Sequence, residues 1–472
     1  MKDIVHDPDV RHSDASVRHS DASVRHSDVR HSDATLGRGL AAARRTDAIT
    51  RIGFAAPVAA PAAVLAAFPA APVVAWSSRE RVIVGIGVAR ELRASGDGRW
   101  DELVAGARAT ELGPEIGEVR GAQRWLGGAA FAPGAADRAP WRGFGDAWFA
   151  LPRWTYSHDG MRGELVLAID ARDATSGSRW RDELAAVQRA LAEPFAPRPQ
   201  LPTLAVVRDR TTAWHDGVCA ITDAIARGEC TKIVAARTVS VELSGPARPA
   251  DLFSELDVRH PDCVRVLVRP PDGGTLVAAT PERLVRLDGR AVTCDALAGS
   301  RRRDEAASDA EALLASGKDR REHAIVVDAI VSVLRELGAD VDAADVPNVR
   351  ALRHVLHLHT PISATLPRAR HVLELAARLH PTPAVGGTPT RFASEWIAAH
   401  EPARGWYAAP IGWFDRDGNG ELAVALRCGV LAGSRAQLWA GAGIVAGSDP
   451  ERELAETELK LRPMLGALGS EQ

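Results

Sequence analysis

Lys232, in the stretch GECTKIVAARTVSV over residues 228–241, is the residue whose type most needs a chemical explanation. The chain contains 58 Lys and Arg residues, but its lysines are only Lys2, Lys232, Lys318 and Lys460. Both residue types serve as surface charge, but only a lysine amine can lose its proton in a protein and then act as a base. Because Lys2 follows the initiator, the other three lysines are the candidates for acid–base chemistry.

Carboxylates on two expected helices are candidates for binding a metal ion. In GKDRREHAIVVDAIVSVL, Glu322 shares a helical stripe with apolar residues such as Val326, and a carboxylate there needs a partner or a metal ion. In ERELAETELK, Glu453, Glu456 and Lys460 are spaced i, i+3 and i+7 and lie on one helical face. Two glutamates on separate helices suit Mg²⁺. The alternatives are a solvated salt-bridge face and a helix end that reaches water.

Glu282 and a group of histidines are further candidates. Glu282, in ATPERLVRL, lies between two strand-like runs, where a glutamate is most often an exposed loop residue. His354, His357 and His359 lie close together in LRHVLHLHTPIS, and strand alternation places the last two on one face. Zinc is disfavoured because no cysteine or further ligand pattern lies nearby. We therefore expect histidines that form hydrogen bonds.

Two motifs resemble binding loops but are better explained by local structure. DRDGNGE, over 415–421, resembles the start of an EF-hand loop, but the twelfth position of that loop is Leu426 instead of the required Glu. Its Asp-Gly and Asn-Gly pairs predict a hairpin turn. GAGIVAG, over 441–447, has no room after it for a dinucleotide-binding βαβ unit. Its small residues allow the backbone to approach an anion, and residues 448–450 predict a helix start.

The elements that position these residues form a mixed pattern. Strands are expected at 73–76, 81–89, 232–242, 263–269, 407–415, 420–430 and 436–440, with a hairpin-like pair over 274–295. Helices are expected at 180–194, 211–227, 304–338 and from 450 onward. Since strands and helices do not alternate regularly, the pattern predicts one large α+β domain with mixed, largely antiparallel sheets.

The N-terminal region differs in composition from the rest of the chain. An RHSD unit begins at positions 11, 18, 25 and 30, so residues 1–50 are expected to be a disordered low-complexity tail. Residues 51–72 are expected to be a Pro/Ala-rich lead-in. Residues 73–200 are expected to form the first part of the domain, and residues 201–470 are expected to form the catalytic region, because they hold the candidate residues above.

Bulk composition excludes several classes of protein. A net charge of -3 gives no general attraction to nucleic acid or to an anionic membrane. Residues 52–78 carry no charge, but their four prolines disfavour a membrane helix. The five cysteines are scattered and form no CxxC pair, which predicts a reducing cytoplasm. We expect no nucleic-acid partner, no membrane partner and a monomer.

Eight blocks in one order resemble the chorismate-utilising enzymes, and among them most closely the isochorismate synthases. The blocks are KIVAAR, ATPERL, ALAGSRRR, GKDRREH, LRHVLHLHTPI, LHPTPAVGG, EPARGWYAAPIGWFDRDGNGELAVALR and WAGAGIVAGSDPERELAETELKL. The resemblance is dense over residues 200–468 and loose from about residue 73. It implies the single α+β domain of this family and the Mg²⁺-dependent isomerisation of chorismate to isochorismate. In that reaction water adds at ring carbon 2 and the hydroxyl at carbon 4 leaves.

The resemblance also implies roles for individual residues. Lys232 matches the general base that activates water, and Glu282 matches the general acid that protonates the leaving hydroxyl. Glu322 and Glu456 match the Mg²⁺ ligands, with Asp319 and Glu453 placed to hold metal-bound waters. The positions that match substrate-binding or pocket segments are Arg427, Lys460, Gly441, Gly443, Gly299, Ser300, His357 and Ala384. Elementary chemistry agrees, because hydroxide is a poor leaving group that needs an acid, and arginine could not serve as the base.

The sequence departs from the family pattern at two positions. The family's WHLxTxIxG block reads LHLHTPISA, with Leu356 for Trp and Ala364 for Gly, so packing near His357 is expected to differ.

A salicylate synthase, which goes on to eliminate pyruvate, is the nearest alternative activity, and HPTPAVGG favours the enzymes that stop at isochorismate. Anthranilate synthase and aminodeoxychorismate synthase are disfavoured by Lys232 and Ala298, respectively. A catalytically silent binding partner is disfavoured because no acid, base or metal position is lost.

Overall fold

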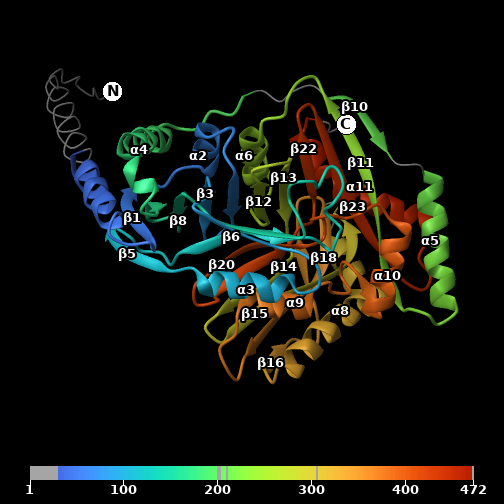
Figure 1. The fold of residues 1–472 in the computed structure, drawn as a ribbon. Helices are drawn as coiled ribbons and strands as arrows, with labels where there is room; N and C mark the ends of the chain where they lie inside the picture. The colour runs from blue at the N-terminus through green and yellow to red at the C-terminus, as the bar shows by residue number, and fades with distance from the viewer. Residues whose placement is uncertain (1–29, 199–202, 209–210, 304–306, 470–472) are drawn as a thin grey trace, which may run out of the picture.

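Two large β-sheets with helices on their outer faces make up the protein, in the computed structural model of Figure 1. The structure describes residues 30–198, 203–208, 211–303 and 307–469. Within these residues, β1 (Ile49–Ala56) pairs in parallel with β5 (Leu112–Gly117), and all other strand pairs are antiparallel. The expected α+β class with largely antiparallel sheets is therefore confirmed.

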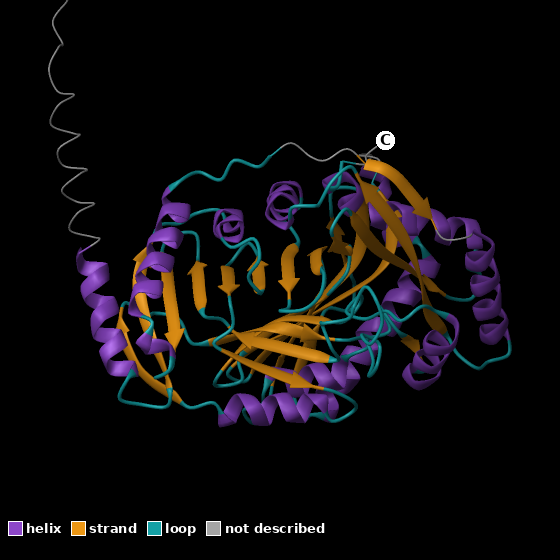
Figure 2. Ribbon diagram, turned by 45° about the horizontal axis from the view of Figure 1, so that its top comes forward, coloured by secondary structure: helices purple, strands orange, loops and turns teal. Residues whose placement is uncertain are grey.

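In the described ranges, the strands form one 13-stranded and one 10-stranded sheet. In hydrogen-bonded order the first sheet contains β10 (Thr203–Arg208), β11 (Lys232–Leu243), β23 (Arg435–Ile444), β22 (Cys428–Ala432), β13 (Thr275–Thr280), β12 (Val264–Arg269), β2 (Val73–Ser77), β3 (Val82–Ile86), β8 (Trp154–His158), β9 (Gly163–Ile169), β1 and β5, with β19 (Gly387–Thr388) paired to β11. The second sheet contains β16 (Asp340–Ala343), β18 (Val355–Thr365), β15 (Ala291–Arg302), β14 (Arg283–Asp288), β21 (Gly420–Val424), β20 (Pro410–Asp415), β6 (Arg124–Ala129), β7 (Ala147–Leu151) and β4 (Arg90–Ala94), with β17 (Asn348–Ala351) paired to β18. Figure 2 shows the strands of the two sheets running in clearly different directions.

The helices divide between the two sheets. Those that pack on the first sheet or beside its helices are α2 (Pro61–Ala67), α4 (Gly177–Ala192), α6 (Pro249–Arg259) and α11 (Pro450–Ala467). Those that pack on the second sheet are α3 (Arg99–Ala109), α7 (Ala307–Ala315), α8 (Gly317–Glu336) and α9 (Val372–Leu379). Near β11 lie α5 (Thr211–Ala226) and α10 (Thr390–His400), and a short 3₁₀ helix, η1 (Asp173–Thr175), precedes α4.

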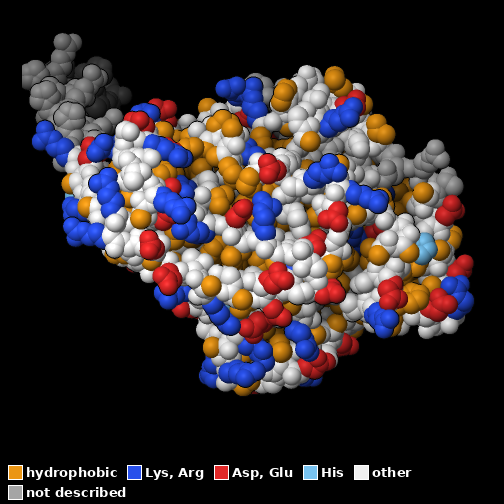
Figure 3. Space-filling view, in the orientation of Figure 1, with side chains coloured by type: hydrophobic (Ala, Val, Ile, Leu, Met, Phe, Trp, Pro, Cys, Tyr) orange, Lys and Arg blue, Asp and Glu red, His pale blue; other side chains and the backbone are white. Residues whose placement is uncertain are grey.

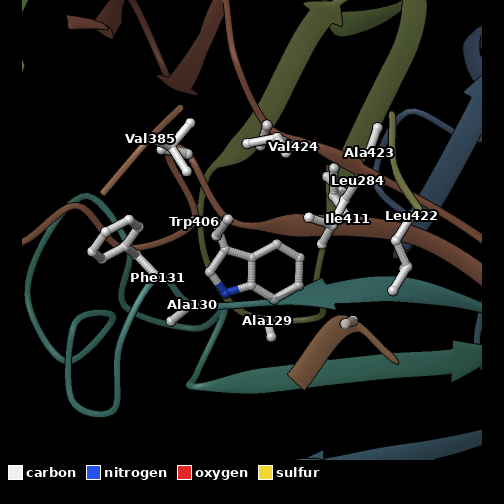
Figure 4. Packing of buried hydrophobic residues seen from close by; sticks show 14 of the residues in the cluster. Ala129, Ala130, Phe131, Leu284, Val385, Trp406, Ile411, Leu422, Ala423 and Val424 are labelled. Atoms are coloured by element: carbon white, nitrogen blue, oxygen red, sulfur yellow. The ribbon is translucent and has the colours of Figure 1, made fainter. Parts of the chain in front are cut away.

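Hydrophobic layers on both faces of the first sheet hold this arrangement together. In β12, Val266 and Val268 join the core shared with the second sheet, while Leu267 joins the core under the outer helices. This is the period-2 alternation of a strand that is buried on both faces. Trp406 packs among hydrophobic side chains (Figure 4), and its indole N–H donates to Gly145 O at 2.9 Å.

The surface is charged but mixed in sign. On the face shown in Figure 3, lysines and arginines are interspersed with aspartates and glutamates, in keeping with the net charge of -3. None of the helices in the described part of the chain has both the length and the apolar character needed to cross a membrane. The uncharged stretch over 52–78 instead forms most of β1, all of α2 and β2.

The elements with strong local signals lie where the sequence predicts them. The helices expected at 180–194 and 211–227 are α4 and α5, and the strand expected at 232–242 is β11. The Asp-Gly-Asn-Gly turn joins β20 to β21, and Asp415 Oδ1 accepts hydrogen bonds from the backbone N–H groups of Asp417 and Asn419, both at 2.9 Å. The predicted hairpin is therefore confirmed.

The expected N-terminal tail and lead-in are wrong for the described residues. Residues 30–43 form a helix whose Leu36, Leu40 and Ala43 are buried, and β1 lies inside the first sheet between β5 and β9. The fourth RHSD unit belongs to this helix, because the residues that follow it supply the apolar face that the repeat itself lacks. The other three repeats, within residues 1–29, lie outside the described residues.

Three expected elements are divided in the structure. The helix expected over 304–338 is α7 and α8, which are separated where Ser316 caps α8 by accepting from Asp319 N. The hairpin over 274–295 is three strands, β13, β14 and the start of β15. The strand expected over 420–430 is β21 and β22. The segment between these last two strands carries Arg427, whose positive φ of 48° is incompatible with a continuous strand.

Candidate active site

A cavity collects residues from both sheets and from two helices. It encloses about 680 Å³, its open mouth included, which is the size of a small-molecule site. The sequence-predicted residues that line it are Glu282, Gly299, Ser300, Glu322, His357, Ala384, Arg427, Gly441, Gly443 and Lys460. Residues separated by up to about 180 positions thus meet in one place.

Lys232 is the first residue of β11 and is completely buried. Its Nζ lies 2.8 Å from Oε1 of Glu322, which extends from α8 into the cavity. Burial alone would raise the pKa of Glu322, but the charge and hydrogen bond of Lys232 outweigh it and lower that pKa. The lysine and the glutamate therefore form a buried ion pair beside the cavity.

Gly443 leaves the space that this ion pair needs. A Cβ at position 443 would lie 2.3 Å from Glu322 Oε1 and 2.9 Å from Lys232 Cε. We expect Gly443→Ala to displace the pair and to lower the stability by about 1–3 kcal/mol, the usual cost of overpacking. Calorimetric unfolding measures this loss.

Gly217→Ala is the matched control, because nothing lies within 4 Å of the Cβ that it adds on α5. There we expect no loss, and a gain of up to about 1 kcal/mol from the better helix former. Equal unfolding temperatures for Gly443→Ala and the wild type would contradict the packing argument.

Glu282 lies in the turn between β13 and β14 and is 5% exposed. Its carbonyl accepts from Val424 N at 3.0 Å, and its N–H donates to Thr280 Oγ1 at 3.3 Å, so the turn is tied to β21. Burial, aided by the negative charge of Asp295, raises the pKa of the Glu282 carboxyl to about 8. The carboxyl is therefore largely protonated at neutral pH and can donate a proton inside the cavity.

Arg427 presents a cation in the same cavity without a carboxylate partner among the described residues. It is 8% exposed, and its Nη2 lies 2.7 Å from Nε2 of His357. Because a guanidinium only donates, His357 Nε2 is the acceptor and the ring proton is on Nδ1, which lies 3.1 Å from Ser300 Oγ. Burial and the nearby Arg427 hold the pKa of His357 well below its usual value, so the ring is neutral. A buried unpaired arginine predicts an anionic ligand.

A β-bulge shapes this wall of the cavity. The register of β15 against β18 shifts between Ala298 and Ser300, and Gly299 between them has a positive φ of 73°. A Cβ on Gly299 would lie 2.9 Å from Cβ of Asp319. The bulge therefore needs glycine, and it brings β15 against the start of α8.

Carboxylates from α8 and α11 meet at the edge of the cavity, and lysines hold three of them. The pairs are Lys232 with Glu322 at 2.8 Å, Lys460 with Glu456 at 2.7 Å and Lys318 with Glu453 at 2.6 Å. Burial, with the charge of Glu456, raises the pKa of Glu453, and burial, with the charge of Glu322, raises that of Asp319. The four carboxylates thus repel one another, and three lysines compensate part of their charge.

This donor set suits a hard divalent cation. No three carboxylates, imidazoles or thiols in the described ranges lie close enough to enclose an ion. Mg²⁺ does not require such a cage, because it is usually held by one or two carboxylates and keeps several waters. Glu322 and Glu456 are two carboxylates of this kind, each paired with a lysine here, and their donor chemistry fits a magnesium ion.

The remaining histidine and glycine predictions have mixed outcomes. Hydrogen-bonding histidines are confirmed, since His359 Nε2 lies 2.9 Å from Asp295 Oδ1 and His357 contacts Arg427. The loop expected at Gly441–Gly443 is instead the last part of β23, paired with β11. Its small residues still leave room at the cavity, and Gly441 O accepts from Lys460 Nζ at 2.9 Å.

Sequence analysis missed the aromatic wall of the cavity. Tyr407 and Trp439 line it, with ring centroids 6.4 Å apart and nearly parallel planes. Tyr407 is one of only two tyrosines in the chain, so the rarity argument that selected Lys232 would also have selected it.

Comparison with known proteins finds one protein family and several curated sequences that are similar to this chain. The family described as "Chorismate binding enzyme" matches residues 39–469. The salicylate biosynthesis isochorismate synthase of Pseudomonas aeruginosa is 35% identical over 418 residues, which are 84% of this chain and 85% of that protein. The isochorismate synthase MenF of Bacillus subtilis is 39% identical over 264 residues, 55% of this chain and 56% of the relative.

Solved structures resemble the fold over most of its length. MenF, the menaquinone-specific isochorismate synthase from Escherichia coli, matches with a TM-score of 0.76 and 26% identity, over 93% of this chain and all of that one. Anthranilate synthase component I from Streptococcus pneumoniae matches with a TM-score of 0.66 and 22% identity, over 82% of this chain and 92% of that one. The second likeness concerns the fold alone.

Proposed function

Because the chain belongs to the chorismate binding enzyme family, we propose that it is an isochorismate synthase that converts chorismate to isochorismate with Mg²⁺. The names of its relatives from Pseudomonas aeruginosa and Bacillus subtilis support this isomerase activity. The observation that carries the mechanism is the buried Glu282 carboxyl, whose pKa of about 8 makes it an acid at neutral pH in a cavity that also holds an unpaired arginine. We expect the enzyme to act as a monomer in the cytoplasm.

The proposed reaction exchanges a hydroxyl between two ring carbons. Lys232 takes a proton from water as the water oxygen bonds to C2, the two conjugated ring double bonds each shift by one position, and the C4–O bond breaks. Glu282 gives its proton to the departing hydroxyl, which leaves as water. Because Lys232 Nζ is paired with Glu322 in the ligand-free protein, this role requires the amine to be released from that carboxylate first.

Substrate charge is compensated by this chain's cations and by the metal ion. Chorismate is a dicarboxylate, and we assign its carboxylates to Arg427, Lys460 and the backbone at Gly441–Gly443. Glu322 and Glu456 would hold Mg²⁺ directly, with Asp319 and Glu453 holding its waters. When bound, the ion supplies positive charge at a substrate carboxylate. Gly299, Ser300, His357 and Ala384 shape the rest of the pocket.

Arg427→Gln is expected to raise the KM for chorismate by about 10- to 100-fold with a smaller change in kcat, because a charge-assisted contact to the substrate is lost. Steady-state kinetics at saturating Mg²⁺ measures both constants. Arg286→Gln is the control, since Arg286 pairs with Glu80 at the surface. A KM for Arg427→Gln within about twofold of the wild type would contradict the assignment.

Incubation of the purified protein with chorismate, with Mg²⁺ and after its removal by a chelator, tests the proposed function. Chromatography of the products is expected to show isochorismate only when Mg²⁺ is present. Salicylate together with pyruvate would instead identify a salicylate synthase. Unchanged chorismate under all conditions would identify a catalytically silent binding protein.

A further inference from the structure

Lys318 is a lysine in a chain that otherwise uses mostly arginine, and the proposed reaction gives it no role. It is one of the four lysines, and it is the second residue of α8, directly after Gly317. A cation in the first turn opposes the helix dipole, and this position favours an acidic residue. Its position therefore needs a reason outside α8.

That reason is Glu453 on α11. Lys318 Nζ lies 2.6 Å from Glu453 Oε1, and the carboxylate is 3% exposed while the lysine side chain is 37% exposed. Glu453 also lies near Glu456, whose negative charge repels it. The lysine thus reaches in from the solvent side and neutralises a buried carboxylate at the proposed metal site.

The choice of lysine over arginine is informative. An ammonium makes a flexible, point-like contact, whereas a guanidinium grips a carboxylate with a planar fork of two hydrogen bonds. Glu453 would need a partner when no metal is bound and would need to turn to a metal-bound water when the metal is present. A lysine suits both states better than an arginine, because its single contact breaks more readily. Arginine fills nearly every other cationic position in the sequence.

We propose that Lys318 is a built-in counter-cation that competes with Mg²⁺ for Glu453, pairing with it in the metal-free protein and being displaced when the ion binds. This inference rests on the metal site of the proposed function. It adds a residue that touches neither substrate nor reacting atoms and that sets the metal affinity.

Titration calorimetry of the chorismate-free protein with MgCl₂ tests the proposal on two opposite variants. Lys318→Gln removes the competitor and is expected to tighten Mg²⁺ binding by about three- to tenfold, the effect of one partly buried ion pair. Lys318→Arg keeps the charge but pairs more firmly, so it is expected to weaken Mg²⁺ binding. Arg321→Gln, which removes an exposed charge from the same helix, is the control and is expected to stay within about twofold of the wild type.

Thermal unfolding gives a second readout. Without metal, Lys318→Gln leaves Glu453 buried and unpaired, so its unfolding temperature falls, and saturating Mg²⁺ raises it by more than in the wild type. Unchanged Mg²⁺ affinity in both Lys318 variants, or weaker binding in Lys318→Gln, would overturn the proposal. Failure of the wild type to bind Mg²⁺ would overturn it too. Because no chorismate is present, these results are separate from failure of the proposed isomerase activity, which the product analysis reports.

Discussion

Lys232→Arg is expected to lose isochorismate formation by about 10²- to 10⁴-fold, the usual contribution of a general base. Arginine can replace the charge that pairs with Glu322 at 2.8 Å, but it cannot accept a proton from water. The variant therefore separates the ion pair from the chemistry. Single-turnover kinetics with saturating chorismate and Mg²⁺ measures the loss in the chemical step.

Two controls distinguish this loss from misfolding, since Lys232 is fully buried and arginine is larger. Circular dichroism and Mg²⁺ titration are expected to show that Lys232→Arg keeps the fold and still binds the ion, with the weaker affinity expected when an arginine pairs with Glu322. Lys232→Met, which has a similar volume and no charge, should be equally inactive. Near-normal turnover in either folded variant would contradict the assignment of Lys232 as the base.

Glu282→Gln is expected to cause a loss of similar size, because an amide has no acidic proton for the leaving hydroxyl. In the wild type, kcat/KM should fall as the pH rises past about 8, where the Glu282 carboxyl ionises. The residual activity of Glu282→Gln should lack this descending limb. A variant that keeps both the rate and the limb would show that another group is the acid.

The same substitution should stabilise the protein at alkaline pH. The pKa of Glu282 is raised from 4.5 to about 8 on folding, so between these values the folded state holds a proton that the unfolded state has released. Stability is therefore lost as the pH rises through this window, by an amount on the order of a few kcal/mol. Glu282→Gln lacks this loss, so its unfolding temperature relative to the wild type should increase from pH 5 to pH 8.5. A constant difference would contradict the raised pKa.

Local signals in the sequence were sufficient for elements whose structure depends on neighbouring residues. The Asp-Gly-Asn-Gly turn needs only its own side chains and glycines, and it forms between β20 and β21 as predicted. The α11 start at residues 448–450 is likewise local, since Asp449 caps the helix by accepting from Arg452 N at 3.0 Å. Both predictions rest on contacts within a few residues.

Elements that depend on distant partners were predicted poorly. The sequence of β1 predicts the start of a Pro/Ala-rich lead-in, yet the segment is a strand because β9 and β5 pair with it on either side. The sequence predicts that Arg427 is part of a strand, but its backbone has a φ of 48°. Its side chain contacts His357, which lies in β18. Such tertiary pairing is absent from any local window of sequence.

For the site, residue chemistry selected the lysines and glutamates, and only the structure reveals how they pair. The scarcity of lysine singles out Lys232, but its contact with Glu322 joins β11 to α8 across 90 positions. The elevated pKa of Glu282 depends on burial and on Asp295 from β15, neither of which is visible in the segment ATPERL.

The most direct test of the central claim, that water attacks C2 while the C4 hydroxyl leaves, is the origin of the oxygen on the product. Isochorismate formed in H₂¹⁸O should carry one ¹⁸O atom, located at C2 by mass spectrometry, in every molecule produced by the wild type. Isochorismate without the label would mean that the substrate's own hydroxyl migrates, and it would contradict the account.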